Sequence, residues 1–225
     1  MTGGKSDVIV VGCGMGGMAA AAAAFEGGAT VTILERAPRE ERGGQTRYTE
    51  AYFRMKSEHE VTDDFESHLA ENACGYLDPS LIHLTAEPRE NWPGVVKALS
   101  FNDPESIATL AGAAGPTIRW LKSFGVKFDF LPTQFLTKSQ PRLLPIGGGL
   151  ALVEALAAFA EKKGAQFVYD TAATELIRDG AGAVTGVRAV GKGGAAREFA
   201  GKAVVLACGG FEGNAEMLTR YIGPR

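Results

Sequence analysis

The chain begins with an apolar run that stops at a cluster of glycines and resumes as an alanine-rich segment. Val8–Val11 is continuously apolar, which is typical of a strand buried on both faces. The alanine-rich segment predicts a helix over about 15–26, because alanine favours helix and Gly27-Gly28 follows as a stop. A second apolar run, Thr30–Leu34, comes next. This strand–helix–strand order predicts a parallel sheet with a right-handed crossover.

The middle of the chain, from about residue 40 to 102, is polar and irregular. A clear helix start follows, because Asp103 suits an N-cap and Pro104 suits the first helical position. Residues 131–149 are rich in proline and glycine, which indicates a loop. The elements predicted for this part are possible helices near Asp63–Cys74 and Pro93–Leu99, a helix from Pro104 towards Phe124, and a strand at Val126–Phe130.

The last third of the chain opens with a predicted helix, Leu150–Lys163, that ends at Gly164. Alternating segments separated by glycines then predict a small antiparallel meander. Its strands are predicted at Gln166–Tyr169, Thr174–Ile177, Val184–Val190 and Ala196–Phe199, and a final strand at Lys202–Ala207. Taken together, the pattern predicts a Rossmann-like α/β domain with a parallel sheet, helices and a small antiparallel β-meander.

Composition narrows the function classes. A formal net charge of -3 over 225 residues gives no basic field for nucleic acid. No apolar run reaches the roughly 18 residues of a membrane span. The three cysteines are far apart and show no metal-ligand spacing with the three histidines, so neither a disulfide nor a metal site is expected. These features favour a cytoplasmic protein.

The glycine cluster has the spacing of a dinucleotide-binding turn, Gly12-x-Gly14-x-x-Gly17. In such a turn the first glycine makes the bend, the second lets a pyrophosphate approach the backbone, and the third lets the helix pack closely. The helix start supplies N–H donors and a positive dipole. Glu35 follows the second strand, where a carboxylate accepts both hydroxyls of an adenosine ribose and disfavours a 2′-phosphate. The motif alone leaves nicotinamide and flavin open.

Four stretches spread along the chain carry a resemblance that favours flavin. They are "VIVVGCGMGGMAAAAAAFEGGATVTILERAP", "RGGQTRYTEA", "GGGLALVEALAAFAEKKGAQFVYDTAATELIRD" and "AVVLACGGFEGN". In order and spacing the chain resembles the FAD-dependent family that includes fumarate reductase and succinate dehydrogenase flavoproteins, 3-ketosteroid dehydrogenases and tricarballylate dehydrogenase. The second stretch most resembles tricarballylate dehydrogenase, although Gln45 and Tyr48 depart from its pattern.

The resemblance assigns cofactor-binding roles to residues in five places. Those near the pyrophosphate are Gly12, Gly14, Met15, Gly16 and Gly17, and those near the adenosine ribose are Glu35, Arg36 and Ala37. Those under the isoalloxazine are Gly43, Gly44, Gln45 and Thr46. Ala173 is expected to contact the edge of the adenine through its backbone. The residues expected to lie near the pyrophosphate and the ribityl chain are Ala207, Cys208, Gly209 and Gly210. Covalent attachment of FAD in succinate dehydrogenase uses a histidine near the position of Thr46. This chain has threonine at that position, so noncovalent FAD is expected here.

Two arginines have two possible roles. Arg47 and Arg142 are either solvated loop residues or guanidinium groups that grip a substrate carboxylate. No catalytic residue is assigned, because the catalytic arginine of the fumarate reductases belongs to a part of the family's length beyond this chain. Residues 1–225 are expected to be the N-terminal portion of the FAD-binding domain, with a capping domain beginning near 215–225 and a C-terminal FAD segment outside the chain.

The function implied is the FAD-binding part of a dehydrogenase of a small polycarboxylate such as tricarballylate, inactive by itself. Hydride would pass between a substrate C–C bond and FAD N5, and an iron–sulfur protein would accept the electrons. A fumarate reductase, a 3-ketosteroid dehydrogenase-like flavoprotein and a non-catalytic nucleotide-binding module remain open. An NAD-dependent dehydrogenase is disfavoured, because that fold gives no function to the segments Gly43-Gly44 and Ala207–Gly210.

Overall fold

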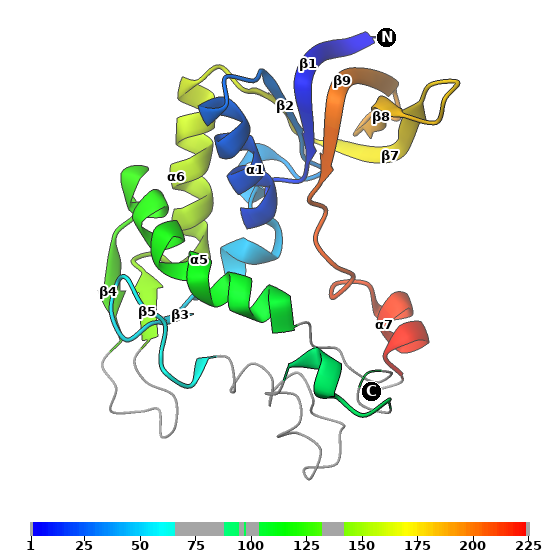
Figure 1. The fold of residues 1–225 in the computed structure, drawn as a ribbon. Coiled ribbons are helices and arrows are strands. Elements are labelled where there is room, and N and C mark those ends of the chain that lie inside the picture. The colour runs from blue at the N-terminus through cyan, green and yellow to red at the C-terminus, as the bar shows by residue number, and fades with distance from the viewer. Residues whose placement is uncertain (1, 66–87, 95–96, 98–103, 132–141, 224–225) are drawn as a thin grey trace. The chain divides into compact units, whose positions relative to one another are not determined.

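The structure is a computed structural model that describes residues 2–65, 88–94, 97, 104–131 and 142–223. The chain divides into two compact units. One consists of Met1–Ala51 and Gly147–Arg225, and the other of Tyr52–Ile146. Figure 1 shows the fold, and each unit is described below by itself.

The first unit is built on a six-stranded sheet in the order β6-β2-β1-β9-β8-β7. The strands in sheet order are β6 (Gln166–Val168), β2 (Val31–Leu34), β1 (Thr2–Val11), β9 (Ala196–Leu206), β8 (Val184–Gly191) and β7 (Thr171–Arg178). The four strands from β6 to β9 are parallel, whereas β9, β8 and β7 pair antiparallel. The predicted fold class is therefore confirmed.

Two strand predictions were wrong in detail. The segment at Gln166–Val168 does not join the meander, since it pairs parallel with β2 at the edge of the sheet. The two strands expected at Ala196–Phe199 and Lys202–Ala207 are one strand, β9. Gly201 lies between the two predicted strands, and a Cβ at this position would lie 2.9 Å from Cγ1 of Ile9. The glycine lets β1 approach β9 and does not mark a turn.

Two helices of this unit, α1 (Met15–Glu26) and α6 (Gly148–Lys162), pack side by side (Figure 1). Small buried residues of both helices, including Ala22 and Ala160, allow a close approach. A core of aliphatic and aromatic residues lies within the sheet and comprises Ile9, Val11, Leu34, Val168, Val187, Ala189 and Phe199. The remaining elements are the 3-10 helices η1 (Arg39–Glu41) and η2 (Gly44–Tyr48) and the short helix α7 (Ala215–Tyr221).

The second unit contains helix α5 (Pro104–Ser123) and a three-stranded antiparallel sheet. The strands are β3 (Phe53–Arg54), β5 (Arg142–Pro145) and β4 (Phe128–Phe130), in the order β3-β5-β4, and a 3-10 helix, η4, spans Arg89–Asn91. Its core comprises Met55, Ala114, Ile118 and Leu143.

Strand β5 was predicted as part of a loop, which was wrong for these four residues. The prolines suggested a loop, but Pro145 is the last residue of β5, and β3 pairs only with Arg142 and Leu143. The missing N–H of Pro145 therefore interrupts no pairing with β3. The possible helices at Asp63–Cys74 and Pro93–Leu99 lie largely outside the described residues. Within the part that the structure describes, no helix has the length and apolar character to cross a membrane.

Candidate functional site

The glycine turn between β1 and α1 is shaped by close backbone approaches. Gly12 has a φ of 106°, and a Cβ there would lie 2.4 Å from the carbonyl oxygen of Ala207. A Cβ on Gly17 would lie 1.9 Å from the carbonyl oxygen of Gly12, so the first turn of α1 rests directly on the bend. Both positions admit only glycine without a shift of the backbone.

The start of α1 is arranged differently at its two other glycines. A Cβ on Gly14 would meet its nearest atoms at 3.7 Å, and one on Gly16 at 4.0 Å, which are ordinary contact distances. Gly14 is the N-cap and offers no side-chain oxygen to the helix, although the Thr46 hydroxyl accepts the N–H of Met15. The first turn also carries no acidic residue. The helix start thus offers backbone N–H groups and a positive dipole to an anion that can approach closely.

Glu35 fixes the turn from the end of β2. Its side chain is 7% exposed, and its two carboxylate oxygens accept backbone N–H groups, Oε2 from Cys13 and Oε1 from Ala37, each at 2.8 Å. Burial, together with the negative charge of Glu35, raises the pKa of the Cys13 thiol well above its ordinary range. Cys13 therefore remains a neutral thiol under the glycine loop.

The Gly43–Thr46 segment is tied to the start of α1. Gly43 and Gly44 have φ angles of 117° and 52°, and they lead into η2. The hydroxyl oxygen of Thr46 accepts the Met15 N–H at 3.1 Å. This segment therefore lies directly against the start of the helix and accepts its first N–H group.

Ala207–Gly210 reaches the same place from the other end of the chain. β9 is parallel to β1, with Leu206 opposite Val11, and the Ala207 N–H donates to the Val11 carbonyl at 2.9 Å. Both strands therefore release their following loops at the same edge of the sheet, where α/β proteins bind ligands. Three predicted segments that are distant in sequence are brought together here.

The remaining predicted residues lie elsewhere or face solvent. Ala173 is in the edge strand β7 opposite Ala189, and β7 adjoins Glu35 through the Thr171 N–H, which donates to the Glu35 carbonyl at 2.9 Å. Arg36 and Gln45 are exposed. The ligand contacts expected of these residues stay predictions.

The two candidate substrate arginines are engaged differently. Nη1 of Arg47 donates to the carbonyl oxygens of Glu40 at 2.8 Å and Arg42 at 3.1 Å. Arg142 lies in the second unit, in β5, with its guanidinium 4.2 Å from the centre of the Tyr52 ring. Their roles toward a substrate also stay predictions.

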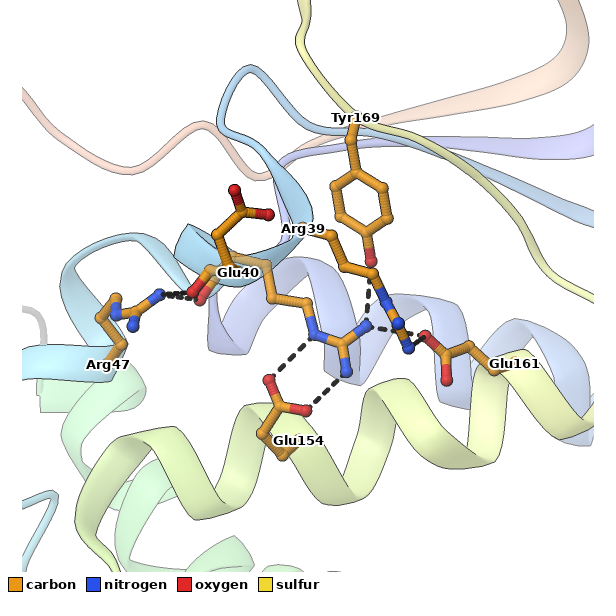
Figure 2. A network of polar contacts seen from close by, with 7 residues as sticks. Arg39, Glu40, Arg47, Glu154, Glu161 and Tyr169 are labelled. Atoms are coloured by element: carbon orange, nitrogen blue, oxygen red, sulfur yellow. Dashed lines mark hydrogen bonds and ion pairs between the residues drawn. The ribbon is translucent and has the colours of Figure 1, made fainter.

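Arg42, which sequence reasoning did not single out, holds a polar network beside this site (Figure 2). Its side chain is 5% exposed and pairs bidentately with Glu154, through Nε at 2.9 Å and Nη2 at 2.5 Å. Nη1 also donates to Glu161 at 2.8 Å and to the Tyr169 hydroxyl at 2.9 Å. The only sequence signal was two glutamates seven residues apart, which share one face of α6. Nothing in the spacing indicated that Arg42 reaches them.

With this geometry in place, the chain can be compared with known proteins. Residues 7–224 match the family described as "FAD binding domain". The chain belongs to this family. The predicted cofactor, FAD, is thereby confirmed. Among the described residues no three His, Cys, Asp or Glu side chains gather as they would around a metal ion.

Curated relatives of the FAD binding domain are reductases. The chain is 29% identical to the urocanate reductase of Eggerthella lenta over 225 residues, which cover 96% of this chain and 33% of that protein. It is 28% identical to the NADH:fumarate oxidoreductase of Klebsiella pneumoniae over 227 residues, with 96% of this chain and 21% of that protein covered. The chain thus spans only about a fifth to a third of these relatives' length.

A solved structure supports the fold. The 3-ketosteroid-delta4-(5alpha)-dehydrogenase of Rhodococcus jostii superposes with a TM-score of 0.70 at 23% identity, covering 98% of this chain and 49% of that one. At this identity the likeness supports the fold alone. It extends over nearly the whole of this FAD binding domain.

Proposed function

We propose that this chain is the FAD-binding part of an oxidoreductase acting on a C–C bond of a small carboxylate. The observation that carries the proposal is the meeting of Gly12–Gly17, Gly43–Thr46 and Ala207–Gly210 around one helix start. When bound, FAD supplies hydride transfer at N5 of its ring, which no side chain of a protein can supply.

Each part of the site has a distinct task in this proposal. The start of α1 receives the pyrophosphate, because its N-cap, Gly14, has no side chain to occupy the N–H groups, and Gly14 and Gly16 leave room. Glu35 receives the ribose hydroxyls, because a carboxylate that already accepts two N–H groups still has lone pairs to offer. The backbone of Gly43–Thr46 lies under the flavin ring, and the attachment is noncovalent.

We infer further that the substrate is a polycarboxylate related to tricarballylate. Two relatives are named for urocanate and fumarate, which are both unsaturated carboxylates. The stretch "RGGQTRYTEA" resembles tricarballylate dehydrogenase and contains Arg47. Because Nη1 of Arg47 already donates to two main-chain carbonyls, a substrate carboxylate would be held by its Nε and Nη2. The electron acceptor in this proposal is an iron–sulfur protein, and a capping domain begins near residues 215–225.

Flavin spectroscopy tests the proposal. The purified chain is loaded with FAD, desalted, and its visible spectrum is recorded before and after denaturation. We expect flavin that is retained on desalting and released on denaturation. A protein that stays colourless and binds NAD would overturn the proposal.

The substrate is tested under anaerobic conditions in FAD-loaded samples that also contain the rest of the catalytic apparatus, because this chain is expected to be inactive by itself. Tricarballylate and succinate are expected to bleach the flavin once the rest of the catalytic apparatus is present, and fumarate is expected to restore the colour of reduced flavin. Retained FAD that no carboxylate bleaches would favour a nucleotide-binding module without catalysis.

A further inference from the structure

We propose that Arg42 is a positioning residue for the flavin: it fixes the Gly43–Thr46 segment against the start of α1 and so sets how tightly FAD is held. The inference rests on the proposed place of that segment under the flavin ring. It concerns a residue that has no predicted contact with the cofactor and acts only through its neighbours.

The side chain of Arg42 is held in one orientation. A buried guanidinium paired on both edges with Glu154 and Glu161 cannot rotate without breaking charge-assisted hydrogen bonds. The ring of Phe167 lies 5.8 Å from its carbon Cζ, which adds a third direction of contact. The arginine is thereby anchored to α6 and to the segment from β6 to β7 at once.

The main chain of Arg42 connects this fixed side chain to the two glycines that follow it. Its carbonyl oxygen accepts a hydrogen bond from Nη1 of Arg47, a residue of η2 (Figure 2). This bond links the two ends of the segment from Arg42 to Arg47. The next two residues, Gly43 and Gly44, are both in the left-handed region, which glycine visits without preference. Such a pair has little stiffness of its own, so its direction depends on what fixes its two ends. Arg42 fixes one end, and the Thr46 hydroxyl at the Met15 N–H fixes the other.

The charges of Glu154 and Glu161 also support a positioning role for Arg42. Arg42 holds the pKa of Glu154 below its usual value chiefly through its hydrogen bond, and it does the same for Glu161. Without Arg42 the negative charges of Glu154 and Glu161 would repel each other, and among the described residues the cation still paired with Glu161 would be Arg39, which is 64% exposed. The exposed Arg39–Glu161 pair, at 3.1 Å, is therefore a poor substitute for the buried clamp.

The test compares Arg42→Lys with Arg39→Gln. Both changes alter an ion pair to Glu161, but only the first removes the bidentate clamp next to Gly43, because lysine keeps the charge and lacks the guanidinium fork. For each full chain the dissociation constant for FAD, the reduction potential of the bound flavin and the thermal midpoint of the apoprotein are measured. We expect Arg42→Lys to weaken FAD binding about tenfold or more, the size of one lost charge-assisted hydrogen bond, and to shift the potential. Arg39→Gln is expected to leave both unchanged.

A second variant keeps the test decisive if Arg42→Lys fails to fold. Glu154→Gln removes one charge at a side chain that is 49% exposed and retains an oxygen acceptor for Arg42, so it is expected to fold and to weaken FAD binding in the same direction. Unchanged FAD affinity and potential in the folded variants would overturn the inference while leaving the FAD site intact. A wild-type chain that takes up no FAD would overturn the proposed function and this inference with it.

Discussion

The starts of α1 and α6 look alike in sequence and differ in structure. Each helix follows a glycine cluster and has a glycine as N-cap, Gly14 for α1 and Gly147 for α6. At α6 the chain itself covers the start: the Gly149 N–H donates to the Thr49 carbonyl at 2.8 Å, and a Cβ on Gly149 would lie 2.0 Å from the Thr46 carbonyl oxygen. At α1, Gly14 and Gly16 leave space beside them. A glycine cluster before a helix thus marks close packing by the chain itself in one case and open space beside the helix start in the other.

The largest effect is expected within α1 itself. Gly17→Ala should lower the free energy of unfolding by about 3 kcal/mol or more, because its Cβ would overlap the Gly12 carbonyl. Gly16→Ala, one residue away and exposed, should change it by less than about 1 kcal/mol, with the gain in helix propensity as the main term. Urea unfolding followed by circular dichroism measures both. Equal losses in the two variants would contradict the described packing.

At α6 the same substitution should act through the neighbouring segment. Gly149→Ala is expected to cost about 2–3 kcal/mol of unfolding free energy, because the Thr46 carbonyl must move. The matched control is Gly112→Ala in α5, where no described atom lies within 4 Å of the added Cβ, and a gain of up to about 1 kcal/mol is expected. If Gly149→Ala were as stable as its control, the start of α6 would be as open as that of α1.

The affinity for FAD should also distinguish the start of α1 from the start of α6. Gly14→Ala places a methyl group at the open side of α1 at ordinary distances from the protein, so the apoprotein should keep its stability. If the pyrophosphate approaches there, FAD binding should weaken about tenfold, or about 1.4 kcal/mol. Titration of the apoprotein with FAD measures this. An unchanged dissociation constant would place the pyrophosphate away from Gly14.

Low pH should lower the free energy of unfolding, because the glutamates of α6 lose their ion pairs when they are protonated. Because Arg42 lowers the pKa of Glu154 and Glu161 in the folded chain, their stabilisation is complete above the ordinary glutamate pKa of about 4.3 and is lost as the pH falls through the lowered values. Glu154→Gln should flatten this acid limb by about 1 kcal/mol or less, since Glu154 is half exposed and screened by solvent. Unfolding curves at a series of pH values provide the measurement. An acid limb as steep in the variant as in the wild type would exclude Glu154 as its source.

The smallest effect is a difference in labelling at the α1 turn. Iodoacetamide at mildly alkaline pH should modify Cys208, which is exposed, and spare Cys13, which is buried with a raised pKa. FAD should slow the labelling of Cys208 if Ala207–Gly210 passes the cofactor. Peptide mapping by mass spectrometry reads the two sites separately. Rapid labelling of Cys13 would show that the glycine loop opens.

Sequence reasoning succeeded where one residue type decides the local structure. The bounds of α1 were predicted as found, because the alanines favour helix and the flanking glycines end it. Glu35 was placed correctly at the end of β2, because the spacing of the βαβ unit fixes it. It failed where a distant partner decides. The two strands predicted on either side of Gly201 are one strand in which this glycine lies against Ile9 of β1, and Arg42 is distinguished from other arginines by the residues of α6 that it contacts.

Strand β9 has a consequence for the order in which the molecule is made. It lies between β1 and β8, so the parallel and the antiparallel halves of the sheet share this one strand. On the ribosome the glycine turn emerges before β9, and the Ala207 carbonyl that lies against Gly12 is supplied only after β9 has been synthesised. Until then β1 carries an unpaired edge, which is a hazard for a nascent chain. Any arrest of synthesis before residue 196 would therefore leave a chain with an exposed strand edge and a glycine turn that lacks the Ala207 segment beside it.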